Sequence, residues 1–201
     1  MRRVTFAVTI LLAIAALAGS AAGAERFQRH AVRGHGVSLA VPASWVAVDG
    51  RVPQAVVDEL SRDNPTLAPF LQQLGRPSSP MKLIALDPAV RRGFATNVNV
   101  VVASLPAGLT FAGYRRGLVG EIRAIGARGV KHRVVEIRGA RAVRVEYRFD
   151  ITVQTKRTVQ TLQYAFLRPG RSIVVTYTTL PSLAGRYAAT FRRSAASFRF
   201  G

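Results

Sequence analysis

The stretch AVRVEYRF, residues 142–149, sets the fold expected for this chain. Apolar or aromatic side chains alternate with charged ones along it, and successive side chains of a β-strand point to opposite faces of their sheet. The alternation therefore predicts a strand that buries one face and exposes a ladder of charges on the other. The predicted inward side chains are Val143, Val145, Tyr147 and Phe149, and the outward ones are Arg144, Glu146 and Arg148.

Three further strand patterns surround this one at short spacing. They are VKHRVVEI (130–137), VQTLQYAFL (159–167) and SIVVTYTTL (172–180). The dipeptide Pro169-Gly170 forms a turn between the last two strands. Consecutive strands joined by short turns pair in an antiparallel manner. These four strands therefore predict an antiparallel sheet in the second half of the chain.

The first half of the chain adds strands and helices to this sheet. Strands are expected at 37–48, 81–86 and 96–105, and helices at 53–60, 64–75 and 110–125. The last of these helices has an apolar stripe at spacings of three and four residues, formed by Phe111, Tyr114, Leu118, Ile122 and Ile125. The predicted fold class is α+β, with a mostly antiparallel sheet of about six to seven strands covered by helices.

The segment ATFRRSAASFRF (189–200) places arginines among aromatic residues near the end of the chain. We expect it to lie on a last helix that begins near Ser182. On a helical wheel one arc is apolar and the arginines lie on its two flanks. The aromatic residues are thus predicted to anchor the helix to the core, with the arginines as its solvated rim. The apolar arc holds Tyr187, Phe191, Ala195 and Phe198.

Residues 1–24 have the pattern of a secretory signal peptide. Two arginines at positions 2 and 3 precede an apolar run, and the small residues Ala22 and Ala24 flank Gly23 ahead of Glu25. We expect cleavage near Ala24 and a secreted or extracytoplasmic protein. The alternative is an N-terminal membrane anchor, because the apolar run is just long enough to span a bilayer.

The remaining chain is expected to form one domain. Residues 25–36 are polar and contain glycines, which predicts a flexible entry segment, and 37–201 is the predicted single domain. Its length suffices for a sizeable core. The chain has no cysteine, which excludes disulfides and a cysteine-linked lipid anchor.

The charge of the chain is strongly positive. It is +19 at pH 7, from 29 lysines and arginines against 10 acidic residues. Such a charge favours association with anionic surfaces such as lipid headgroups or wall polymers; nucleic acid is not expected as a partner of an exported protein. The arginines are scattered, however, and no run of five or six like charges forms a basic arm. The candidate polyanion contacts are Arg115, Arg116, Arg192 and Arg193.

The sequence offers little for catalysis or metal binding. The only histidines are His30, His35 and His132; the first two lie in the predicted entry segment and the third between Lys131 and Arg133. A zinc site needs several converging ligands, and a serine hydrolase needs a nucleophile, a base and an acid. No nucleophile elbow, P-loop or dinucleotide motif is present. We therefore expect no catalytic, cofactor-binding or metal-ligating residues.

The order of these elements resembles the PsbP-like superfamily, which includes PsbP, DcrB-like and LpqN-type exported proteins. The resemblance rests on GVSLAVPASWVAV near the start, then NVNVVV, AVRVEY, LQYAFLRPG, SIVVTYTTLP and the closing FRRSAASFRF. It covers roughly residues 36–200 and implies an antiparallel sheet between helices, an α/β/α sandwich. The superfamily is mostly non-catalytic. LpqN-type members often carry a lipid-anchoring cysteine, which this chain lacks.

These observations predict an exported, non-catalytic binding or accessory protein of the cell envelope. Its partner is an envelope or extracellular protein, or a small apolar ligand held between sheet and helix. The alternative is a basic protein that binds anionic membrane or wall polymer through surface arginines. A hydrolase is a distant third.

Overall fold

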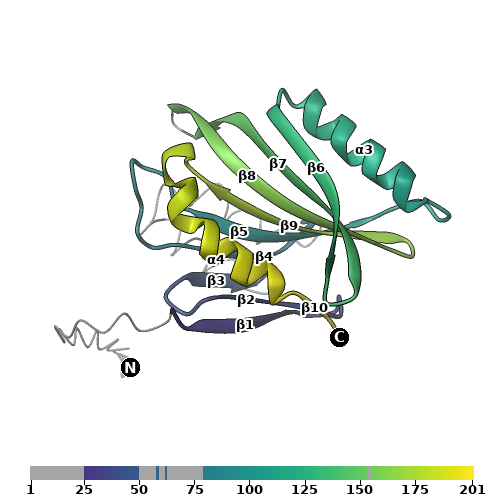
Figure 1. Ribbon diagram of the computed structural model, residues 1–201. Coiled ribbons are helices and arrows are strands. Elements are labelled where there is room, and N and C mark those ends of the chain that lie inside the picture. Colours follow the sequence, from purple (N-terminus) through teal and green to yellow (C-terminus); the bar gives the residue numbers. More distant parts are fainter. Residues whose placement is uncertain (1–24, 50–57, 59–61, 63–78, 154) are drawn as a thin grey trace, which may run out of the picture.

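A computed structural model of the chain describes residues 25–49, 58, 62, 79–153 and 155–201 (Figure 1). The predicted signal peptide at 1–24 lies outside the described residues. So do the helices expected at 53–60 and 64–75, apart from residue 58.

A seven-stranded sheet forms the centre of the fold. Its strand order is β3-β4-β5-β9-β8-β7-β6, and every neighbouring pair is antiparallel. The α+β class and the mostly antiparallel sheet are thus confirmed. The strands are β3 (Val46–Asp49), β4 (Met81–Leu86), β5 (Asn97–Ser104), β6 (Arg128–Ile137), β7 (Ala140–Val153), β8 (Thr155–Arg168) and β9 (Arg171–Thr179).

A second sheet of three strands has the order β1-β2-β10, with β1 at Phe27–Val32, β2 at Val37–Pro42 and β10 at Arg199–Phe200. The flexible entry segment predicted at 25–36 is therefore wrong, because β1 pairs with β2 along its whole length. As an edge strand, β1 has one side open to solvent, so polar residues do not prevent its pairing.

The strand expected at 37–48 divides between the two sheets. A turn closed by the Trp45 N–H and the Pro42 carbonyl, 3.0 Å apart, separates β2 from β3. The chain therefore leaves the small sheet at Pro42 and enters the edge of the large sheet at Val46. Pro42 interrupts the alternation of Val37, Leu39 and Val41 in the sequence, but the apolar residues that follow it did not reveal that the chain changes sheet there.

The two helices of the described part cover opposite faces of the large sheet (Figure 1). Helix α3 (Phe111–Ala124) packs on the cluster that contains Ala165 of β8, whereas α4 (Ala184–Ala196) packs on the cluster that contains Phe166. Adjacent residues of a strand point to opposite faces. A 3-10 turn, η1 (Pro181–Leu183), leads into α4. Neither described helix is long and apolar enough to cross a membrane.

The core beneath α4 contains the four residues predicted for it. Tyr187, Phe191, Ala195 and Phe198 are all buried, and Phe198 lies just beyond the end of the helix, stacked on Phe166 with ring centroids 4.3 Å apart. The arginines of the same segment are exposed. This confirms the predicted division into aromatic anchors and a solvated rim.

The stripe predicted for α3 is confirmed except at its end. Thr110 accepts the Gly113 N–H at 3.1 Å and so caps the helix, and Tyr114 and Ile122 are buried. Ile125 is 60 % exposed, because the helix ends at Ala124 and the chain turns away at the following residues. Its expected place in the apolar stripe is therefore wrong.

Candidate functional site

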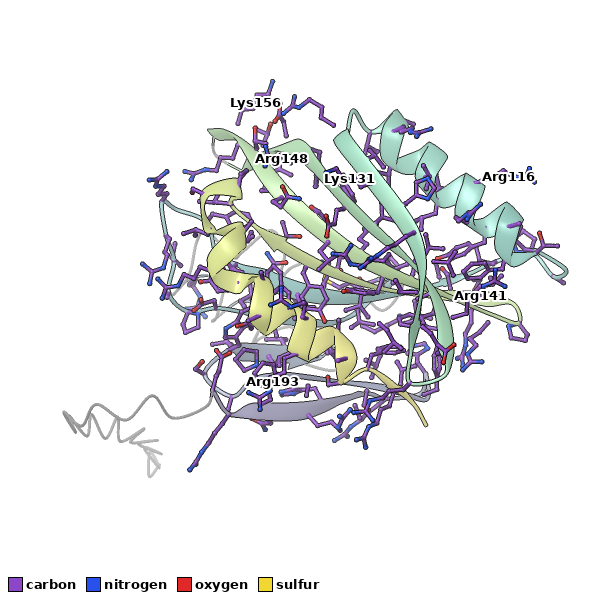
Figure 2. All side chains as sticks on the ribbon, in the orientation of Figure 1. Arg116, Lys131, Arg141, Arg148, Lys156 and Arg193 are labelled. Carbon is purple, nitrogen blue, oxygen red and sulfur yellow. The ribbon has the colours of Figure 1, made fainter. Side chains whose placement is uncertain are left out.

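The four arginines proposed as polyanion contacts do not converge. Arg115 and Arg116 lie on α3 and Arg192 and Arg193 on α4, on opposite faces of the large sheet (Figure 2). The guanidinium of Arg193 also lies 4.3 Å from the centroid of the Phe27 ring and donates to the Glu25 carbonyl at 2.7 Å. These residues therefore form two separate sites at most, and their binding of polyanions remains a prediction.

A different set of charged side chains gathers on the α4 side of the large sheet, where β6, β7 and β8 extend past the helix. Strand register places them on one face, because directly paired residues share a face and this face contains Ala142 and Phe166 of the core under α4. We call this surface the open face. Its residues are Lys131, Arg133, Arg144, Glu146, Arg148 and Gln160.

The two charged residues nearest the centre of the open face neutralise each other. Arg144 forms an ion pair with Glu146, and both side chains are partly buried. Arg148 donates from Nε to Gln160 Oε1 at 2.7 Å, which holds its guanidinium across the neighbouring strand. Among the described residues, the ion pairs do not include Lys131, Arg133 or Arg148, so the surplus charge of this face is positive.

An acidic residue marks the end of the open face. Asp150 accepts from Arg128 Nη2 at 2.8 Å and from the Thr158 hydroxyl at 2.7 Å, and Lys156 lies 3.4 Å away. These hydrogen bonds, led by the one from Arg128, lower the pKa of Asp150 to about 2. The carboxylate is therefore ionised near neutral pH, and its oxygens already accept hydrogen bonds from Arg128 and Thr158.

A surface pocket of about 440 Å³ opens beside these residues. It combines the two features of the open face, a positive surplus and hydrogen-bond donors held in place. Its lining consists of Arg128, Gly129, Lys131, Glu146, Tyr147, Arg148 and Gln160. Figure 2 shows Lys131 and Arg148 in this region, on strands that are neighbours in the sheet.

The described residues near this pocket do not assemble an acid–base pair. Burial raises the pKa of Tyr147 to about 12, so its hydroxyl stays protonated near neutral pH. His132 is exposed on β6, as expected of a surface strand residue. Within the described ranges, no three histidine or acidic side chains come together as a metal site would require. The arrangement suits binding of an anionic or hydrogen-bonding partner.

Lys131 and Arg133 were missed in the sequence as parts of a site. The signal available was their alternation within VKHRVVEI, which predicts a strand but not the strand's partner. Only the pairings Lys131 with Glu146 and Arg133 with Arg144 bring these charges together on one surface.

Comparison with known proteins finds similarity in structure. No protein-family model matches the chain, and no curated protein matches it in sequence. The solution structure of the cyanobacterial PsbP (CyanoP) of Synechocystis sp. PCC 6803 matches with a TM-score of 0.50 and 18% identity, over 92% of this chain and 99% of that one. The crystal structure of LpqN, involved in cell envelope biogenesis of Mycobacterium tuberculosis, matches with a TM-score of 0.52 and 11% identity, over 86% and 90%.

At these identities the likeness concerns the fold. The antiparallel sheet between α3 and α4 corresponds to the architecture that the sequence resemblance implied. The chain therefore has a PsbP-like α+β fold.

Proposed function

We propose that this chain is an exported accessory protein of the cell envelope that docks on another envelope protein through its open face, without catalysing a reaction. The observation that carries the proposal is the surface of β6, β7 and β8 beside α4. It presents six charged or polar side chains from three adjacent strands and has a surplus of positive charge.

The shape of this surface favours a macromolecular partner. Neighbouring strands lie about 4.8 Å apart, so side chains from three of them spread over a broad area instead of converging on one point. Lys131, Arg133 and Arg148 are exposed. The rim of a protein interface is polar and solvent-accessible, so these side chains suit a rim that donates hydrogen bonds to a partner. Complementary charge steers association, so the matching surface of the partner is acidic.

Two observations support a location in the envelope. The pattern at residues 1–24 predicts export. LpqN, which shares the fold, is described as involved in cell envelope biogenesis. Together they make an envelope protein the most suitable partner to test.

Charge reversal on the open face tests the proposal. We would express the full chain and the K131E/R148E variant in producing cells, capture each with an antibody, and identify co-purified envelope proteins at about 0.15 M salt. The matched control is R123E/R186E, which makes the same change of charge on the exposed sides of α3 and α4.

We expect a specific partner with the natural chain and with the control, and its loss with K131E/R148E. A partner that the control loses to the same extent would show that net charge governs the association. A partner that K131E/R148E retains fully would contradict docking through the open face.

A further inference from the structure

Four arginines meet at the edge of the molecule where the small sheet joins the large one. Arg29 comes from β1, Arg138 from the turn between β6 and β7, Arg168 from the end of β8, and Arg199 from β10. All four are exposed. We call this set the arginine edge. It is separate from the open face, since the two share no residue.

Contacts with the protein hold three of these arginines in place. Arg29 Nη1 donates to the Ser38 hydroxyl at 2.9 Å and to the Ser197 carbonyl at 3.1 Å. Arg138 Nε donates to the Ala196 carbonyl at the end of α4, at 2.9 Å.

The guanidinium of Arg168 lies 3.7 Å from the centroid of the Phe200 ring. Each of these contacts uses only part of a guanidinium group, which has five N–H donors, so donors remain for a ligand. Fixed donors lose less freedom on binding than mobile ones do.

The arginine edge concentrates positive charge without a matching carboxylate. Among the described residues, the ion pairs do not include any of its four arginines. Arg29 and Arg138 donate to the neighbouring carbonyls of Ser197 and Ala196 at the end of α4, so their guanidinium groups lie near each other and near Arg199. Burial, then the charges of Arg199 and Arg138, lower the pKa of Arg29. The charge continues towards the β1–β2 turn, where burial, Lys82 and Arg171 lower the pKa of His35. Like charges held together in this way destabilise the folded protein unless an anion joins them.

The backbone at Arg138 is also unfavourable for this residue type. Its φ is +49° and that of Gly139 is +75°, so both residues of the β6–β7 turn are in the left-handed region. Asparagine or glycine normally fills the first position of such a turn. An arginine there costs stability, and such costs are typical of positions kept for function.

A recess of about 250 Å³ lies between three residues of the arginine edge, Arg138, Arg168 and Arg199. Aromatic side chains form part of its wall: Phe200 supports Arg168, and Phe198 stacks on the core residue Phe166. The recess is therefore a firm concavity with cationic sides. Its lining consists of Ile137, Arg138, Gly139, Ala140, Arg168, Phe198, Arg199 and Phe200.

We propose that this recess binds a phosphate group carried by an anionic polymer, with Arg138, Arg168 and Arg199 as its ligands. Phosphate suits the site better than carboxylate, because several guanidinium groups surround one recess and a single fork already satisfies a carboxylate. A polymer suits it better than a bilayer, since a chain can enter a concavity whereas a flat surface meets only its rim. Arg29, which is bonded to the Ser197 carbonyl, and Arg171, which is paired directly with Arg168 across the β8–β9 turn, extend the positive charge for neighbouring phosphates.

The test measures binding of a labelled inorganic polyphosphate of about 15 units to the purified protein by fluorescence anisotropy at 0.15 M salt. We expect the R168Q/R199Q variant to bind about tenfold or more weakly, and the slope of log Kd against log salt to fall by about one to two, as for the loss of one or two phosphate contacts. The R168K variant keeps the charge but loses the fork, so we expect an intermediate affinity.

The control variant R123Q/R186Q removes the same charge away from the recess, and we expect its affinity to change less than about twofold, because only long-range charge is lost. Thermal unfolding checks that each variant is folded. An equal loss in R168Q/R199Q and the control would contradict the proposal. So would equal affinity for polygalacturonate of matched charge, or binding to phosphatidylglycerol vesicles that R168Q/R199Q retains while polyphosphate fails to bind. None of these results depends on the open face.

Discussion

The hydroxyl of Tyr177 on β9 donates to Ser194 Oγ on α4 at 3.0 Å, and Ser194 in turn donates to the Ala40 carbonyl on β2 at 2.7 Å. These two buried bonds join the large sheet, the helix and the small sheet. Burial raises the pKa of Tyr177 far above its ordinary value, so the hydroxyl remains a donor. The chain of bonds fixes how the two sheets lie against α4.

Removal of the Ser194 hydroxyl and removal of the Tyr177 hydroxyl are predicted to lower the free energy of unfolding by different amounts. S194A leaves the Tyr177 hydroxyl without its acceptor and removes a donor to Ala40, which costs about 1–3 kcal/mol. Y177F removes the hydroxyl itself and costs about 1 kcal/mol. Urea unfolding of the two single variants and of the double variant measures these losses in the free energy of unfolding. We expect the double variant to lose less than the sum, and strict additivity would contradict the coupling.

Phe191 is predicted to be the main anchor of α4. It is 5 % exposed, with its ring centroid 4.9 Å from that of Tyr177 and 5.8 Å from that of Tyr187. F191A should lower the free energy of unfolding by about 3–5 kcal/mol. R192A, one residue on and exposed, should change it by about 0.5 kcal/mol or less. Similar unfolding curves for the two variants would contradict the division between anchors and rim.

Sequence periodicity predicted the parts of the fold that bury one face. Val143 and Val145 alternate with charges and are fully buried, and Tyr187 and Phe191 follow the helical period. It failed at β1, because an edge strand with His30 and Arg29 lacks the alternation that a covered strand shows. It also missed β10, whose two residues follow a helix and gain their pairing only from β2.

The candidate surfaces could not be predicted from the sequence, because their residues come from segments that are far apart along the chain. The arginine edge draws residues from four elements between positions 29 and 199, and no local pattern relates them. Arg138 gave one signal, as an arginine before a glycine in a hairpin turn, but its meaning depends on Ala196 and Arg199 lying beside it.

Acid is predicted to weaken the contribution of Asp150 to the stability of the folded protein. Its pKa is lowered from 3.8 to about 2 by its bonds to Arg128 and Thr158, so folding favours the ionised form. That contribution is complete above about pH 4 and is lost as the pH falls through about 2. Thermal unfolding of the natural chain and of D150N should show a difference in Tm that is constant near neutral pH and shrinks between these values. A difference that persists at pH 2 would contradict this assignment.

R138N is predicted to make the protein more stable and a weaker phosphate binder. Asparagine tolerates the positive φ of this position, whereas the loss of an exposed hydrogen bond to Ala196 costs little. The free energy of unfolding should therefore rise by up to about 1 kcal/mol, and Tm should rise with it. Polyphosphate affinity, measured by anisotropy, should fall. A lower Tm with unchanged affinity would identify Arg138 as a structural residue.

The most direct measurement of docking through the open face is site-specific photo-crosslinking in producing cells. A photoreactive residue replaces Gln160 on the open face in one full-length chain and Arg123 on α3 in another. Docking through the open face predicts one defined crosslinked envelope protein from position 160 and its absence from position 123. The same product from both positions, or a product from position 123 alone, would contradict it.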